Sequence, residues 1–159
     1  DVFFLLAGNG YEKKKIIETS KEYGLYNSTV LCIDYVPKDQ IPKLLSMATI
    51  VTSLFIDLPE MENNSANKFF DGLAAGKPIM INYGGWQADL LSKMSCGFII
   101  PPNDAINSAK KINDIITDKS KLSQMSKASI NLAHKFDIET NYNKFVDVID
   151  NVMFAEKIG

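Results

Sequence analysis

The sequence predicts an α/β fold: a doubly wound parallel sheet of about five strands with a helical C-terminal tail. Short, almost continuous apolar runs alternate along the chain with segments of helical periodicity. The runs are rich in β-branched and aromatic residues, which is typical of parallel strands buried on both faces. At 159 residues, the chain has the length of a single domain, and we expect one domain over residues 1–159.

The expected elements follow one another without internal repeats or linkers. The strand-like runs are 2–7, 29–33, 49–55, 78–82 and 97–101. The helical segments are 11–24, 38–47, 65–76, 86–94, 104–117, 120–135 and 139–154. The alternation predicts that each strand is joined to the next by a helix.

The last helical segment carries a stripe of apolar side chains at a spacing of three and four. The stripe consists of Tyr142, Phe145, Val146, Ile149, Val152 and Met153. We favour packing of this stripe against the chain's own sheet. The alternative is that it covers a neighbouring domain or a second copy of the chain, which would give a homodimer through the C-terminal helix.

Composition excludes several classes of function. Apolar residues make up 46% and charged residues 23%, an ordinary balance for a globular protein. The net charge of −2 argues against a nucleic-acid partner. No apolar run approaches the roughly 20 residues of a membrane span, and the opening DVFFLLAGNG lacks a signal peptide's basic segment. We expect a cytoplasmic protein, peripheral at most to the inner face of the plasma membrane.

The residue types of nucleophilic catalysis do not cluster in the sequence. Cys32 and Cys96 are isolated thiols, which we expect to be buried in a reducing compartment. His134 is the only histidine and lies late in a helix, where the helix dipole favours its charge. We therefore expect no self-contained Ser/His/Asp or Cys/His system. We also expect no cofactor and no metal, because helix amides and a lysine can supply the positive potential that a cation would otherwise provide.

Three short motifs have two interpretations each. Gly8-Asn9-Gly10 follows the first strand, where amides could face an anion, but Lys13 occupies the third glycine position of the dinucleotide fingerprint. The acidic stretch 57–64 could hold a metal, although a solvated loop is favoured. Gly84-Gly85-Trp86 could border a ligand crevice, or Trp86 could pack down as the next helix begins.

The stretch NNSANKFFDGLAAGKP, residues 63–78, has the strongest signal. Asn64 or Ser65 is expected to cap a helix whose first amides then remain unpaired and can bind an anion. Asn67, Lys68 and Asp71 lie on one side of this helix. Phe70, Leu73 and Ala74 form the opposite side, and Ala74, Ala75 and Gly76 permit close approach to the sheet. The alternative is that Lys68 and Asp71 form an ordinary surface ion pair.

These residues, in this order, resemble a known family. The segments LAGNGYEKK, IDYVPKDQIPKLLSMATIVTSLF, NSANKFFDGLAAGKPIMINYGGW and CGFIIPPND resemble the C-terminal half of GT-B glycosyltransferases. More narrowly, they are similar to the retaining family 4 (group 1) enzymes of bacterial capsule and lipopolysaccharide assembly. The resemblance implies that the chain binds a nucleotide-sugar donor, a UDP- or GDP-sugar, for transfer to a lipid-linked or polysaccharide acceptor.

The resemblance also implies roles for individual residues. Asp71 matches the second carboxylate of the family's Glu-x7-Glu pair and would hold the ribose hydroxyls. Asn63 matches the first, so the sugar contact there is changed. The amides of Ala66 and Asn67 would meet the diphosphate together with Lys68, and Ser65 precedes them. Gly8 and Gly10 match the family's glycine turn. Tyr35 and Val36 match the residues that contact the nucleobase.

Two parts of the family pattern are expected to lie outside this sequence. One is the acceptor-binding N-terminal domain, and the other is the first strand of the donor-binding domain with its diphosphate-gripping basic pair. The chain would then be a fragment of a longer two-domain enzyme and inactive alone. Without that strand, we expect the family order 3-2-1-4-5-6 to close up as 2-1-3-4-5, the flavodoxin-like order. The alternative is a gap filled by another chain.

Two other functions fit the sequence less well. A receiver-like or interaction module would use Asp57 after the third strand, but it lacks the acidic pair that a receiver carries after its first strand. A nucleotide-sugar epimerase would need catalytic acids and a histidine in the crevice.

Overall fold

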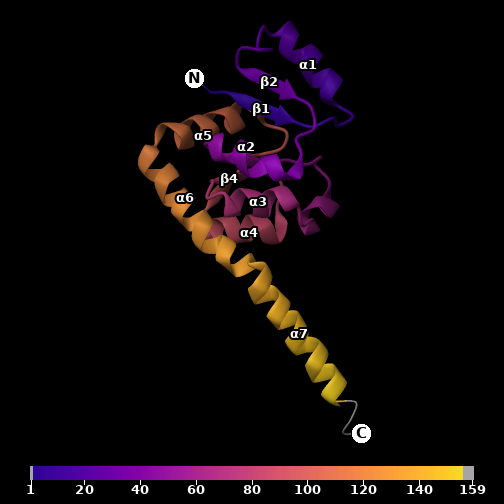
Figure 1. Cartoon of the computed structure of the whole chain (residues 1–159). Helices are drawn as coiled ribbons and strands as arrows, with labels where there is room; N and C mark the ends of the chain where they lie inside the picture. Colours follow the sequence, from indigo (N-terminus) through magenta and orange to yellow (C-terminus); the bar gives the residue numbers. More distant parts are fainter. Residues whose placement is uncertain (1, 156–159) are drawn as a thin grey trace. The chain divides into compact units, whose positions relative to one another are not determined.

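The computed structural model describes residues 2–155 and alternates parallel strands with helices (Figure 1). The α/β class and the five strands predicted from the sequence are confirmed. The chain forms two compact units, Asp1–Leu44 and Leu45–Gly159, and each is described by itself.

The first unit contains a two-stranded parallel sheet. Its elements are β1 (Phe4–Ala7), α1 (Lys13–Glu22), β2 (Val30–Ile33) and η1 (Lys38–Gln40), and α2 (Ile41–Met47) ends in the second unit. Strands β1 and β2 pair from Phe4 opposite Val30 to Ala7 opposite Ile33. All four β1 side chains are exposed, so burial on both faces is wrong for this strand. Two strands and one helix cannot cover both sheet faces.

The second unit contains a three-stranded parallel sheet in the order β3-β4-β5. Its strands are β3 (Val51–Ser53), β4 (Ile79–Ile81) and β5 (Gly97–Ile99). Its helices are η2 (Pro59–Asn63), α3 (Asn67–Ala74), α4 (Gly85–Met94), α5 (Ala105–Thr117), α6 (Lys119–Ala133), η3 (His134–Phe136) and α7 (Ile138–Ala155). Helix α6 packs on α3, α4 and α5.

The strands of the second unit are apolar because they lie in its core. Strand β4 is buried at all three positions, and Phe69, Leu73 and Leu91 from α3 and α4 are inaccessible to solvent. A second cluster on the sheet contains Met80, Phe98, Ile100, Ile115 and Met125. Helices therefore cover both faces of this sheet, as the continuous apolar runs predicted.

The predicted closure into one sheet of order 2-1-3-4-5 is wrong. The five strands form two sheets, and no ladder joins β1 to β3 in the part of the chain that the structure describes. Every observed pair joins strands that are consecutive in sequence and linked by one helix, as in β1-α1-β2 and β3-α3-β4.

The buried side of α3 agrees with the sequence prediction only in part, because Leu73 is buried and Phe70 is half-buried. Phe69, Gly72 and Leu73 are its buried residues, whereas Ala74 is exposed. A Cβ atom at Gly72 would lie 2.5 Å from Ile79 Cδ1 and 2.9 Å from Val51 Cγ1. Gly72, rather than the Ala-Ala-Gly sequence that follows, thus lets this helix approach the sheet.

The apolar stripe of α7 does not pack on the sheet, so the favoured interpretation is wrong. Its side chains remain exposed at Tyr142, Phe145, Ile149, Val152 and Met153. Among the contacts of α7 in the described residues, η3 is the principal neighbour. None of the described helices combines the length and apolarity that a bilayer crossing requires. Cys96 is buried as expected, and Cys32 is half-buried.

Candidate functional site

The first turn of α3 has free backbone donors. The helix begins at Asn67 after Ala66, which has an extended conformation and provides no side-chain cap. The predicted caps, Asn64 and Ser65, therefore do not cap it, since the helix begins two residues later than a cap at Asn64 requires and one residue later than a cap at Ser65 requires. Within residues 2–155 the amides of Asn67 and Lys68 have no hydrogen-bond acceptor. Such amides, at the positive end of a helix dipole, favour an anion.

The polar side chains around this turn are accessible to solvent. Asn63, Ser65, Asn67, Lys68 and Asp71 are exposed. The side of α3 that carries Asn67 and Asp71 is thus accessible to solvent, as the sequence predicted. Among residues 2–155, no side chain forms an ion pair with Lys68 or Asp71. The alternative interpretation, a surface pair between Lys68 and Asp71, does not occur in the structure.

Lys68 is held by an aromatic ring. Its Nζ atom lies 4.6 Å from the ring centroid of Phe55, a cation–π distance. Partial desolvation by the surrounding chain lowers the pKa of the Lys68 ammonium from its ordinary value, although the residue as a whole is exposed. No carboxylate of the described chain forms an ion pair with Lys68, so the Phe55 ring is the contact that holds its ammonium beside the first turn of α3.

The residues after β3 and β4 support that ring. The Asn82 amide accepts from Phe55 N at 2.9 Å and donates to Phe55 O at 2.8 Å. The Tyr83 ring meets the Phe55 ring edge to face, with centroids 5.3 Å apart. The Tyr83 hydroxyl donates to Gln87 Oε1 at 2.6 Å and lies 3.1 Å from Ser53 Oγ. Burial raises the pKa of Tyr83, which keeps this hydroxyl protonated.

The loop before α3 is fixed to the start of α4. Gly85 has φ +78°, and a Cβ atom there would lie 2.1 Å from the backbone oxygen of Glu62. The Trp86 indole N–H donates to Asn64 O at 3.0 Å, and its ring lies over Phe70. Trp86 therefore packs down, one of its two predicted interpretations, and Gly84-Gly85-Trp86 positions the loop that carries Asn63.

The remaining predicted residues lie in the first unit. Gly8 follows β1 with φ +136°, and Gly10 is exposed. Lys13 Nζ binds Asn9 Oδ1 at 3.0 Å, Ile33 O at 3.0 Å and Asp34 Oδ1 at 2.6 Å. This lysine thus ties the glycine turn to the end of β2. The two residues of the expected nucleobase contact differ in exposure: Tyr35 is exposed and Val36 is half-buried.

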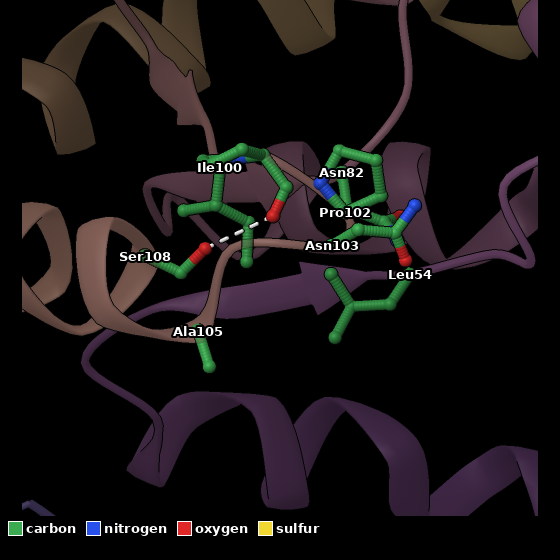
Figure 2. A pocket seen from close by; sticks show the side chains of 8 residues that line it. Leu54, Asn82, Ile100, Pro102, Asn103, Ala105 and Ser108 are labelled. Carbon is green, nitrogen blue, oxygen red and sulfur yellow. Dashed lines mark hydrogen bonds between the residues drawn. The ribbon is translucent and has the colours of Figure 1, made fainter.

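A pocket of about 450 Å³ lies at the carboxyl ends of β3, β4 and β5 (Figure 2). Its lining residues are Leu54, Asn82, Ile100, Pro101, Pro102, Asn103, Ala105 and Ser108. The Ser108 hydroxyl is turned to the Pro101 carbonyl, 3.0 Å away, and the Asn82 amide is engaged by Phe55. The sequence analysis did not predict this pocket. A general rule could have found it, because ligands of open α/β sheets bind outside the carboxyl ends of the strands, next to the residues that follow each strand.

The acidic loop behaves as a solvated segment. Asp57 accepts a hydrogen bond from Asn103 Nδ2 at 2.7 Å. Among the described residues no group of three or more His, Cys, Asp or Glu side chains could hold a metal ion. His134 lies at the C-terminal end of α6 and is exposed, as its position in the sequence predicted.

Comparison with known proteins identifies the family. The model of the family "Glycosyl transferases group 1" matches residues 1–132. The chain belongs to the group 1 glycosyltransferase family. The resemblance to group 1 glycosyltransferases inferred from the motifs is thereby confirmed, and the receiver-like and epimerase interpretations are not supported. A curated relative, probable sucrose-phosphate synthase 5 of rice (Oryza sativa subsp. japonica), is 22% identical over 121 residues, 76% of this chain and 12% of its own.

Solved glycosyltransferase structures share the fold. The HepE protein of Anabaena, crystallised with UDP, has a TM-score of 0.80 at 20% identity, covering 94% of this chain and 41% of its own. The C-terminal domain of the group 1 protein LpcC from Francisella tularensis has a TM-score of 0.65 at 16% identity, covering 79% of this chain and 63% of its own. This group 1 chain thus spans less than half of HepE.

Proposed function

We propose that this chain is the nucleotide-sugar donor-binding part of a group 1 glycosyltransferase. The observation that carries the proposal is the exposed, uncapped first turn of α3 in a member of this family. Free amides at Asn67 and Lys68, the dipole of the helix and one ammonium group suit a diphosphate. A UDP-sugar is the first donor to test, because HepE was crystallised with UDP and with UDP-glucose.

Each side chain has a task in this proposal. The Asp71 carboxylate accepts hydrogen bonds from the ribose hydroxyls, one turn after the amides that bind the diphosphate. Helix amides and Lys68 stabilise the negative charge that develops on the departing nucleoside diphosphate. Asn63 lies on the loop fixed to α4 and replaces a carboxylate contact to the donor sugar with an amide contact. Gly8, Gly10, Tyr35 and Val36 supply the glycine turn and the nucleobase contact.

The acceptor side of the reaction rests on the family resemblance alone. We propose a lipid-linked or polysaccharide acceptor, bound by an N-terminal domain of the longer enzyme, with retention of configuration. Contact of the exposed α7 stripe with a second copy, giving a homodimer, stays a prediction. A location at the inner face of the plasma membrane would follow from a lipid-linked acceptor and stays a prediction too.

Calorimetric titration of the full-length enzyme with UDP and GDP tests the donor proposal. Asp71→Ala should weaken UDP binding by about ten- to hundredfold, since it removes hydrogen bonds to a charged acceptor. Asp89→Ala is a matched control, because Asp89 is an exposed carboxylate on the neighbouring helix α4. If Asp71→Ala leaves the affinity unchanged, the ribose role is wrong. If neither nucleotide binds the unmodified enzyme, the donor-binding function is wrong.

A further inference from the structure

The contact between Lys68 and Phe55 has a property that an ion pair would lack. A carboxylate beside Lys68 would neutralise the ammonium and compete with any incoming phosphate for its N–H donors. The face of an aromatic ring attracts the cation through its quadrupole but accepts no strong hydrogen bond. Nζ of Lys68, 4.6 Å from the ring centroid, is therefore held in place with its donors still available.

The ring itself has little freedom. Both backbone groups of Phe55 are bonded to the single amide of Asn82, at 2.9 and 2.8 Å. The ring edge contacts Tyr83, whose hydroxyl is fixed by Ser53 and Gln87. Strands β3 and β4 bring these residues together, because Ser53 lies opposite Ile81 in the ladder. Phe55 comes two residues after Ser53, and Asn82 comes directly after Ile81. The support is thus built on strand ends rather than on a free loop.

The position of Phe55 suits the proposed diphosphate site. Lys68 is the second residue of α3, so its ammonium and the free amides of Asn67 and Lys68 belong to one helical turn. A free lysine would lose side-chain entropy on binding an anion. A lysine that already rests on a ring has lost part of that freedom before the ligand arrives, which strengthens binding. The negative face of the ring also stabilises the charged form of the ammonium, the form that binds a phosphate.

We propose that Phe55 is a positioning residue that holds the Lys68 ammonium, by a cation–π contact, for the diphosphate of the donor. This inference rests on the proposed function. It predicts that the ring acts on the diphosphate and not on the nucleoside. Its effect depends on Lys68 and is absent when Lys68 carries no charge.

The test is calorimetry of the full-length enzyme with UDP and, separately, uridine. Phe55→Leu keeps an apolar side chain but removes the ring, and we expect UDP affinity to fall about three- to tenfold while uridine affinity is unchanged. Phe55→Tyr keeps the ring face and should restore UDP binding. In a Lys68→Met background, Phe55→Leu should cause no further loss of UDP affinity.

An equal loss of affinity for UDP and uridine in Phe55→Leu would overturn the inference. An undiminished effect of Phe55→Leu in the Lys68→Met background would overturn it as well. If Phe55→Leu does not fold, trifluorophenylalanine at position 55 keeps the ring shape and weakens its quadrupole, and it should give the same selective loss. A wild-type enzyme that binds no UDP would reject the proposed function, whereas UDP binding that depends on Lys68 but not on Phe55 would reject this inference alone.

Discussion

Alanine at Gly85 should destabilise the second unit strongly. Gly85 has φ +78°, a conformation that costs an L-residue about 1–2 kcal/mol. A Cβ atom there would lie 2.1 Å from the backbone oxygen of Glu62 and 2.8 Å from its carbonyl carbon. Backbone atoms cannot rotate away as a side chain can, so the loop must move, at a typical overpacking cost of about 1–3 kcal/mol. We expect a total loss of about 2–5 kcal/mol.

The neighbouring glycine provides a matched control. Gly84 has φ −84°, which any residue adopts. A Cβ atom there would meet the end of the Glu62 side chain, with Oε1 at 3.0 Å, and this side chain can turn away. Gly84→Ala should therefore change the stability by less than about 1 kcal/mol.

Urea unfolding followed by tryptophan fluorescence measures both variants. Trp86 is the only tryptophan of the chain and donates to Asn64 on the loop in question, so its emission reports on this corner. Gly85→Ala should lower the unfolding midpoint, and it should also weaken UDP binding in the full-length enzyme because Asn63 moves with the loop. Equal midpoints for the two alanine variants would refute the reasoning that the loop is fixed by backbone contact.

Three further predictions concern single groups. Ser129→Ala should lower the free energy of unfolding in urea by about 1–2 kcal/mol, because the buried Ser129 hydroxyl lies within hydrogen-bond distance of the Lys77 and Cys96 carbonyls, at 2.8 and 3.2 Å. Ser123→Ala, at an exposed position of the same helix, is the control, and an equal loss of stability in both variants would contradict this role. Trp86→Phe removes the donor to Asn64 O and should cost about 1 kcal/mol in a circular-dichroism melt, so an unchanged melting temperature would show that the bond is dispensable. Burial raises the pKa of the Cys96 thiol from 9.0 to about 11, so the unfolded chain releases this proton at a lower pH than the folded chain, and the free energy of unfolding should fall by about 2–3 kcal/mol between pH 9 and 11. Cys96→Ala should reduce this fall, and an identical pH dependence of stability in both proteins would contradict the role of the thiol.

The local elements could be predicted because their information is local. The five apolar runs and seven helical segments each occur within two or three residues of the observed positions, since periodicity and β-branched content act over one element at a time. The exposed side of α3, with Asn67, Lys68 and Asp71, follows from helical spacing alone. The start of the same helix was placed too early, because Asn64 and Ser65 favour a cap but also suit the extended loop that the structure forms there.

The sequence by itself thus determined the α/β class, the order of the elements and the family, all of which depend on pattern and spacing along the chain. Tertiary structure alone decided which strands pair, which glycine touches which neighbour, and which ring lies under Lys68. Phe55 is far from Lys68 in sequence, and Glu62 is far from Gly85, so only the packing of strand ends and helices brings them within a few ångströms. The division into two sheets and the uncovered stripe of α7 have the same origin, because both depend on neighbours that no local pattern specifies.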